Sequence, residues 1–425
     1  MSQSQTIITG VIVFVIAILM LIILGILPGL KPSRPAPFSI ELWGIRDEEN
    51  IWRTIIKPFQ EVNSHITVHY TRFPEETYES TLVERLAENT GPDVFMLENS
   101  RLIQHREKLY PLPQQALRIS INNFTEAFVD IAASDLIGQD GNIYGMPLYT
   151  DSLALFYNKD LFNIAGIAKP PQNWDELATI SRKLTQISPA GDVAKSGIAL
   201  GSGKNIEYAF EIISAMILQN GDPIINRAKN MITMEKPSQD ALAFYASFAD
   251  RTKQNFTWSN LLPRAQDAFA EEKTAMIFGF SNDIARIKAK NSHINMGVAP
   301  FIQLSDTQKP SAYGRYVFLT VSKLSKHPVD AWNFIAFATN NAQASTYTDL
   351  TDLAPARRDV LTIKAPPLES EVFWRQSLIA KSWPVPDYQK TKILFEDAVE
   401  SISTRSATFP QAFNQLKEQL RLLLP

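Results

Sequence analysis

The chain has 425 residues, of which 45% are hydrophobic and 20% are charged, so it holds enough apolar side chains for two or more compact units and is not a disordered chain. Its 41 basic and 44 acidic side chains leave a formal net charge of -3, which gives no field strong enough to favour nucleic acid or an acidic membrane surface as a partner. Cysteine is absent, which excludes disulfides, thiolate metal sites, cysteine nucleophiles and lipid attachment through a cysteine.

The first segment, residues 7–27, is apolar without a single charge and about long enough to cross a hydrocarbon core of roughly 30 Å. It is longer than the core of a signal peptide, about 7 to 15 residues, and prolines rather than a small-residue cleavage site follow it. We therefore expect residues 1–30 to form an uncleaved signal anchor, with a cleaved signal as the alternative, and residues 31–37 to form a stiff linker. Lys31 and Arg34 follow the apolar segment, so the positive-inside rule would favour a cytoplasmic location for the rest of the chain. Long domains, however, translocate largely regardless of that rule.

Strands and helices alternate next, with strands expected at 39–44, 66–70 and 92–97 and helices at 48–61 and 78–88. This order predicts a parallel sheet with right-handed crossovers, and ligands of such sheets bind beyond the carboxyl ends of the strands. Trp43 and Gly44 end the first strand, and Glu98 and Asn99 follow the third. We expect these residues to meet at one edge; the alternatives are a core position for Trp43 and a solvated carboxylate for Glu98.

The middle of the chain predicts an extended crossing at 147–150 and a short strand at 153–157. A helix is expected to begin at Asn173, whose side chain caps it with Glu176 three residues later. Residues 197–203 predict a strand and a glycine turn, and their glycine spacing does not fit a phosphate loop.

The remaining elements are expected in this order: helices at 207–218, 239–251 and 263–272, a strand at 274–279, a helix capped by residues 280–283, a returning hinge at 297–301, a strand at 313–321, a helix from 325, a crossing at 351–360, a helix at 373–380 and two helices within 391–424.

Several strings along this order are shared with one family. They are GMPLYTDSLALFYNKDLF from Gly145, preceded by DGNIYG from Asp140, then TAMIFG from Thr274, SKHPVDAWNFI from Ser325 and TDLAPARRDV from Thr351. The chain resembles the family 1 extracellular solute-binding proteins, the substrate-catching subunits of ABC importers related to maltose-binding protein. The resemblance covers nearly everything from Ser39 onward.

The resemblance implies an α/β fold of the periplasmic-binding-protein type II, with two α/β lobes joined by a hinge of several crossings. The N-lobe is expected to comprise residues 38–148 and 298–350, and the C-lobe residues 149–297 and 351–425. Ligand-binding residues are expected at Trp43, Gly44, Glu98, Asn99, Asp151, Tyr157, Phe280, Ser281, Tyr313, Gly314 and Trp383.

Three of these residues have particular reasons. Trp383 lies where the family places a cleft aromatic and, between a lysine and a proline, is hard to bury wholly in a helix core. Phe280 is as typical of a core as of a cleft. The family more often has a glycine pair where Tyr313 stands, which leaves Arg315 to meet an anionic ligand group or to lie paired at the surface.

Signatures of hydrolases, kinases and zinc proteases are absent from the sequence, and His65 and His69 share helical spacing within an expected strand. We therefore expect neither an enzyme nor a cofactor or metal. The chain is interpreted as a monomeric protein on the extracytoplasmic side of the cell membrane, held there by its N-terminal helix. It would bind a small solute, foremost a sugar or oligosaccharide, and deliver it to ABC permease subunits.

Other interpretations stay open at this point. The solute is alternatively a polyamine, a glycerol phosphodiester or a peptide-derived compound. The protein is alternatively a sensor, in which closure of the lobes signals to a membrane partner. It is alternatively a glycan-degrading enzyme, which would show turnover of its substrate. A purely structural protein would not become more compact when a ligand is added.

Overall fold

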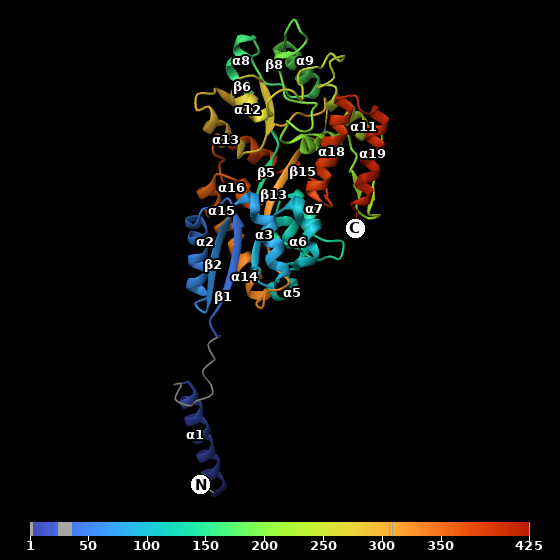
Figure 1. Cartoon of the computed structure of the whole chain (residues 1–425). Coiled ribbons are helices and arrows are strands. Elements are labelled where there is room, and N and C mark those ends of the chain that lie inside the picture. The colour runs from blue at the N-terminus through green and yellow to red at the C-terminus, as the bar shows by residue number, and fades with distance from the viewer. Residues whose placement is uncertain (1–2, 24–35, 306, 308, 425) are drawn as a thin grey trace.

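Two sheets of different size organise the computed structural model, which describes residues 3–23, 36–305, 307 and 309–424 (Figure 1). We call the part built around the larger sheet the N-lobe and the part built around the smaller sheet the C-lobe. In Figure 1 the N-lobe lies below the C-lobe, and strands β5 and β13 run through the junction.

The N-terminal helix α1 spans Gln3–Ile23 and covers most of the predicted anchor. Among the helices of the described ranges, none is long and apolar enough to cross a membrane, so the structure does not support the predicted membrane-spanning helix. The end of that segment and most of the expected linker, residues 24–35, lie outside the described residues.

The larger sheet has eight strands in the order β14-β5-β13-β3-β1-β2, with β4 and β15 also paired to β13. Its strands are β1 Phe38–Ile45, β2 Ile66–Phe73, β3 Val94–Glu98, β4 Leu109–Tyr110, β5 Met146–Ser152, β13 Ala312–Ser322, β14 Ala354–Pro355 and β15 Ala380–Lys381. Strand β1 is parallel to β2 and β3, as predicted, but β13 is antiparallel to both β3 and β5. The sheet is therefore mixed and not all parallel, because the chain re-enters the N-lobe through β13.

Apolar faces of surrounding helices close the N-lobe core. Helix α2 shows the pattern, since Trp52, Ile55, Ile56 and Phe59 recur at helical spacing and are all buried. The N-lobe helices are α2 Glu49–Val62, α3 Glu75–Ala87, η1 Asn99–Arg101, α4 Leu102–His105, η2 Arg106–Lys108, α5 Gln114–Leu117, α6 Ile121–Ala127, α7 Asp130–Leu136, α14 Pro328–Ala338, α15 Asn341–Thr351 and α16 Arg358–Ile363.

The C-lobe surrounds a three-stranded sheet of order β11-β6-β12. Its strands are β6 Ala154–Asn158, β11 Met276–Gly279 and β12 Met296–Ala299, and the ribbons β7 Gln186–Ile187 with β8 Val193–Lys195 and β9 Ile225–Asn226 with β10 Met231–Ile232 flank it. Its helices are α8 Lys159–Ile164, α9 Trp174–Leu184, α10 Ala209–Gln219, α11 Lys236–Ala246, α12 Ala265–Ala270, α13 Asp283–Lys290, α17 Glu371–Gln376, α18 Tyr388–Ser403 and α19 Phe409–Leu422.

Local predictions in the C-lobe had mixed outcomes. The side chain of Asn173 caps α9 by accepting a hydrogen bond from the Glu176 N–H, as predicted. The Glu176 carboxylate accepts from the backbone N–H of Gln172 instead of the backbone N–H of Asn173. Residues 197–201 do not form the predicted strand; this buried segment runs beside β11 with isolated backbone bonds. Residues 297–299, predicted as a hinge, belong to β12, because they pair with β6 inside the C-lobe.

The chain crosses between the lobes along β5 and β13. Tyr149 and Tyr316 belong to the N-lobe core, whereas Leu153 and Tyr313 belong to the C-lobe core, so both crossings fall within a few residues. The register of β5 against β13 shifts near Pro147, whose missing N–H is typical of a bulge.

The β9–β10 hairpin is fixed at its base by Asp222. The Asp222 carboxylate accepts hydrogen bonds from the Ile224 N–H at 2.8 Å, the Thr233 hydroxyl at 2.7 Å, the Glu235 N–H at 2.8 Å and the Ser238 hydroxyl at 2.6 Å. Burial alone would raise the pKa of Asp222, but these bonds lower it below its usual value. The ionised carboxylate therefore stabilises this part of the fold.

We predict that Asp222→Ala lowers the free energy of unfolding by about 2 kcal/mol, because it leaves buried donors without an acceptor. A depressed pKa stabilises the fold above the unfolded value of about 3.9, and this contribution disappears as pH falls through the folded value. Urea unfolding at neutral and acid pH measures both effects. Asp240→Ala, on the exposed face of α11, is the control with an expected loss below about 1 kcal/mol; equal losses in the two variants would contradict the prediction.

Candidate functional site

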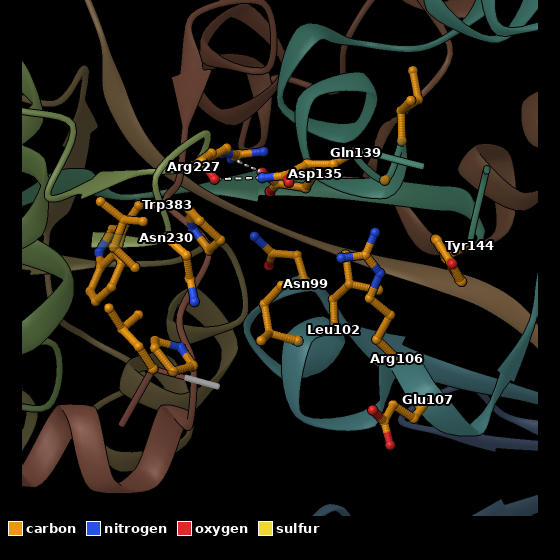
Figure 2. A pocket seen from close by; sticks show the side chains of 17 residues that line it. Asn99, Leu102, Arg106, Glu107, Asp135, Gln139, Tyr144, Arg227, Asn230 and Trp383 are labelled. Carbon is orange, nitrogen blue, oxygen red and sulfur yellow. Dashed lines mark hydrogen bonds and ion pairs between the residues drawn. The ribbon is translucent and has the colours of Figure 1, made fainter. Parts of the chain in front are cut away.

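A cavity of about 440 Å³ lies between the lobes, with walls from both of them (Figure 2). Its size falls within the range of about 300 to 1,000 Å³ that is typical of small-molecule sites. The residues that line it are Asn99, Leu102, Ile103, Arg106, Glu107, Asp135, Ile137, Gly138, Gln139, Tyr144, Ile225, Arg227, Asn230, Trp383, Pro384, Pro386 and Leu424.

The N-lobe wall begins at the carboxyl end of β3. Asn99 follows this strand, and its Oδ1 accepts a hydrogen bond of 3.2 Å from the Tyr316 N–H, which fixes the amide at the wall. Seven residues further on, the Arg106 guanidinium lies 4.7 Å from the centre of the Tyr144 ring and pairs with Asp140 at 3.6 Å. This wall therefore offers an amide and a guanidinium that are held in place by their neighbours.

The C-lobe wall combines the segment between β15 and α18 with residues of the β9–β10 hairpin and the C-terminal Leu424. Trp383 is only 3% exposed, its ring packs edge-on against Phe210, and its Nε1–H donates to the Ser214 hydroxyl at 3.1 Å. The expectation that Trp383 is hard to bury was wrong, because α10 supplies both an aromatic face and a polar partner. Trp383 still borders the cavity, together with Pro384 and Pro386.

Charged and aromatic groups from both lobes flank the cavity. The Arg101 guanidinium of the N-lobe, paired with Glu79 at 2.8 Å, lies 5.0 Å from the Tyr388 ring centre of the C-lobe. The Tyr388 hydroxyl donates to Glu211 at 2.7 Å. Burial raises the pKa of the Glu211 carboxyl above its usual value, and the bond from Tyr388 only partly offsets this rise. Glu98 is half-buried and accepts from the Ser100 hydroxyl at 3.0 Å.

A second cluster of predicted residues lies at the crossing strands. Asp151, 2% exposed, accepts from the Ser281 hydroxyl at 3.0 Å, the Ser281 N–H at 3.2 Å and the Arg315 guanidinium at 3.0 Å. That guanidinium also donates to Asn282 at 2.8 Å and lies 3.8 Å from the Phe280 ring centre. Arg315 is therefore paired, as one of the two alternatives expected, but its side chain is only 13% exposed and does not lie at the surface.

The carboxyl end of β1 and the residue that follows it form a third cluster on the N-lobe. Trp43 packs against Phe73 with ring centres 4.4 Å apart, so part of it belongs to the core. Gly44 is enclosed, since an added Cβ would lie 2.8 to 2.9 Å from the side chains of Tyr70 and Met96. Arg46 directly follows β1, and its guanidinium donates to Glu75 at 3.0 Å. Arg46 was not among the predicted site residues, although its position just beyond a strand end is a signal that the sequence contains.

Tyr157, Tyr313 and Gly314 lie away from the cavity lining. Tyr157 packs against Phe162 in the C-lobe with ring centres 5.0 Å apart. Tyr313 is buried against Phe210, and an added Cβ on Gly314 would lie 2.7 Å from Ala380. Of the predicted ligand-binding residues, only Asn99 and Trp383 line the cavity.

Two α/β lobes joined by crossing strands, with a cavity between them, form an arrangement of a size that can enclose a small molecule. The chain belongs to the bacterial extracellular solute-binding protein family, which it matches over residues 54–374. The predicted resemblance to this family of ABC importer subunits is thereby confirmed.

Individual relatives share about a quarter of their aligned residues with this chain. A putative binding protein of Brucella abortus is 25% identical over 305 residues, which cover 71% of this chain and 72% of the relative. The melibiose/raffinose/stachyose-binding protein MelE of Bacillus subtilis is 23% identical, over 72% of this chain and 70% of MelE.

Solved structures show the same fold. The sugar-binding protein MalE of Xanthomonas citri matches with a TM-score of 0.74 and 19% identity, over 91% of this chain and 97% of MalE. The cyclic alpha-maltosyl-1,6-maltose binding protein of Arthrobacter globiformis matches with a TM-score of 0.76 and 17% identity, over 92% and 99% of the two chains.

Asp47, next to Arg46, titrates differently from a surface carboxyl. It is buried and accepts from the Trp52 Nε1–H and the Tyr347 hydroxyl, both at 3.0 Å. Burial raises the pKa of Asp47 and these two bonds offset only part of the rise, so that the pKa is about 6 in the folded protein. Ionising the group in the folded protein is therefore unfavourable compared with the unfolded chain.

We predict that Asp47→Asn weakens the pH dependence of stability. A raised folded pKa means that the stabilising contribution of Asp47 is complete below about pH 4 and is lost as pH rises through about 6. Because asparagine does not ionise, the melting temperature of the variant should fall less than that of the wild type between pH 5 and 8. Circular dichroism melts at several pH values measure this, and parallel curves for the two proteins would contradict it.

Proposed function

We propose that this protein binds a carbohydrate in the interlobe cavity and delivers it to the permease subunits of an ABC importer. The observation that carries the proposal is the cavity itself, whose 440 Å³ suit a ligand of about disaccharide size and whose walls come from both lobes. The named ligands of relatives support the substrate class, since they include maltodextrin and melibiose, raffinose and stachyose.

The chemistry of the walls suits a sugar, which has apolar C–H faces and a rim of hydroxyls. Trp383, Pro384 and Pro386 would cover the apolar face of a ring. Asn99 and Arg106 would donate hydrogen bonds to hydroxyls from the opposite wall. Glu98, which directly precedes Asn99, is proposed as a further ligand contact.

Delivery follows from binding between lobes. A ligand that contacts both lobes favours the closed arrangement, because it gains contacts there that the open arrangement lacks. The permease subunits would then recognise the surface that the two closed lobes form together.

We predict that a sugar or oligosaccharide raises the melting temperature of the full-length chain after any bound ligand has been removed by refolding. A ligand at about 100 times its Kd adds roughly 2.7 kcal/mol to the stability of the folded state. A thermal-shift screen of maltose, maltodextrins, melibiose, raffinose, polyamines and glycerol phosphodiesters measures this. Shifts with polyamines or phosphodiesters alone would contradict the carbohydrate class.

The place of binding is tested by filling the cavity. Ile103→Trp puts an indole into it and should weaken binding of the selected sugar at least tenfold in isothermal titration. Ile363→Trp is the matched control, because Ile363 is 81% exposed and does not line the cavity. Equal affinities of the two variants would rule out this cavity as the site.

A further inference from the structure

Asp135 of the N-lobe is bound at the rim of the cavity by Arg227 of the C-lobe and by Ser382, which directly follows β15 of the N-lobe sheet and precedes the C-lobe residue Trp383. Its Oδ1 pairs with the Arg227 guanidinium at 2.7 Å, and its Oδ2 accepts from the Ser382 hydroxyl at 2.6 Å. Arg227 also donates to the Ser134 carbonyl, and Gln139 donates to the Arg227 carbonyl. Figure 2 shows Arg227 meeting Asp135 and Gln139 across the gap between the lobes.

Each side of this contact is fixed within its own lobe. Asp135 lies on α7, whose apolar residues Ile131 and Leu136 are buried in the N-lobe core. Arg227 lies in the turn of the β9–β10 hairpin, which Asp222 holds to the C-lobe. The contact therefore depends on how the lobes are placed and is lost when they separate.

The carboxylate carries most of the cost of separation. The Asp135 side chain is 7% exposed and that of Arg227 is 39% exposed, so the contact is only partly screened by water. Hydrogen bonds between charged groups are stronger than those between neutral groups, and a buried carboxylate that loses them is destabilised until water reaches it. Ser382 precedes Trp383, so the same carboxylate also holds the C-lobe wall of the cavity.

We propose that Asp135, Arg227 and Ser382 form a clasp that holds the lobes closed in the absence of ligand. The clasp sets how much of the empty protein is already closed, and hence how much of the ligand's binding energy goes into closing it. It acts as a positioning device at the rim, and it operates whether the ligand is a carbohydrate or another solute.

The absence of native cysteine allows a direct test with two spin labels on the full-length chain. Asn122→Cys on α6 and Gln415→Cys on α19 place labels at exposed positions of the two lobes. Pulsed electron paramagnetic resonance without ligand should show one short distance in the parent and an added longer distance in Arg227→Met. We expect the open-to-closed ratio to rise about tenfold, as for the loss of one charge-assisted hydrogen bond.

Matched variants separate the clasp from general effects of charge. Arg251→Met removes an ion pair of 2.8 Å to Asp192, but both partners lie in the C-lobe, so the distances should not change. Asp135→Asn, which keeps the side-chain size, should open the lobes as Arg227→Met does, and the double variant should add little to either. A parent that is already open, or a distance distribution unchanged in both Arg227→Met and Asp135→Asn, overturns the proposal, independently of any result with sugars.

Discussion

The buried carboxylate of Asp151 is the constraint on which the arrangement of the lobes depends. Asp151 pairs with Arg315 across β5 and β13, and its carboxylate also accepts a hydrogen bond from Ser281 in the turn between β11 and α13. Although burial alone would lower it, the pKa of the Arg315 guanidinium is raised by Asp151 and Glu98, so the guanidinium remains charged. Because a buried charge without its partners is costly, the two crossing strands and the β11–α13 turn are held as one unit.

Arginines cover aromatic rings along the space between the lobes. Arg315 lies over Phe280, Arg101 over Tyr388 and Arg106 over Tyr144. Guanidinium groups gain from the negative face of a ring and from dispersion with it, so each ring is already occupied. Among the described residues, no such arginine contact involves Trp383, which borders the cavity together with Pro384 and Pro386.

Local pattern was enough to predict strands β1 to β3 and helices α2 and α3 of the N-lobe, the cap at Asn173 and the place of Asn99 beyond β3. These features depend on neighbours in sequence or on a general property of parallel sheets. The pairing of Asp135 with Arg227 joins residues 92 positions apart and had no local signal. Trp383 was misjudged for the same reason, since the residues that bury it, Phe210 and Ser214, lie on a helix that is distant in sequence.

Both cores are built from segments that are far apart in the chain. The N-lobe core needs Tyr316 and its neighbours on β13 in addition to residues from Ile40 onward, and the C-lobe core needs Phe395 to Leu420 of α18 and α19. During synthesis from the N-terminus, more than 300 residues must therefore be made before the first sheet receives its central strand, and nearly the whole chain before the second core closes. The nascent polypeptide stays incompletely folded throughout most of its translation, and this interval is the one in which its apolar strands depend on protection from aggregation.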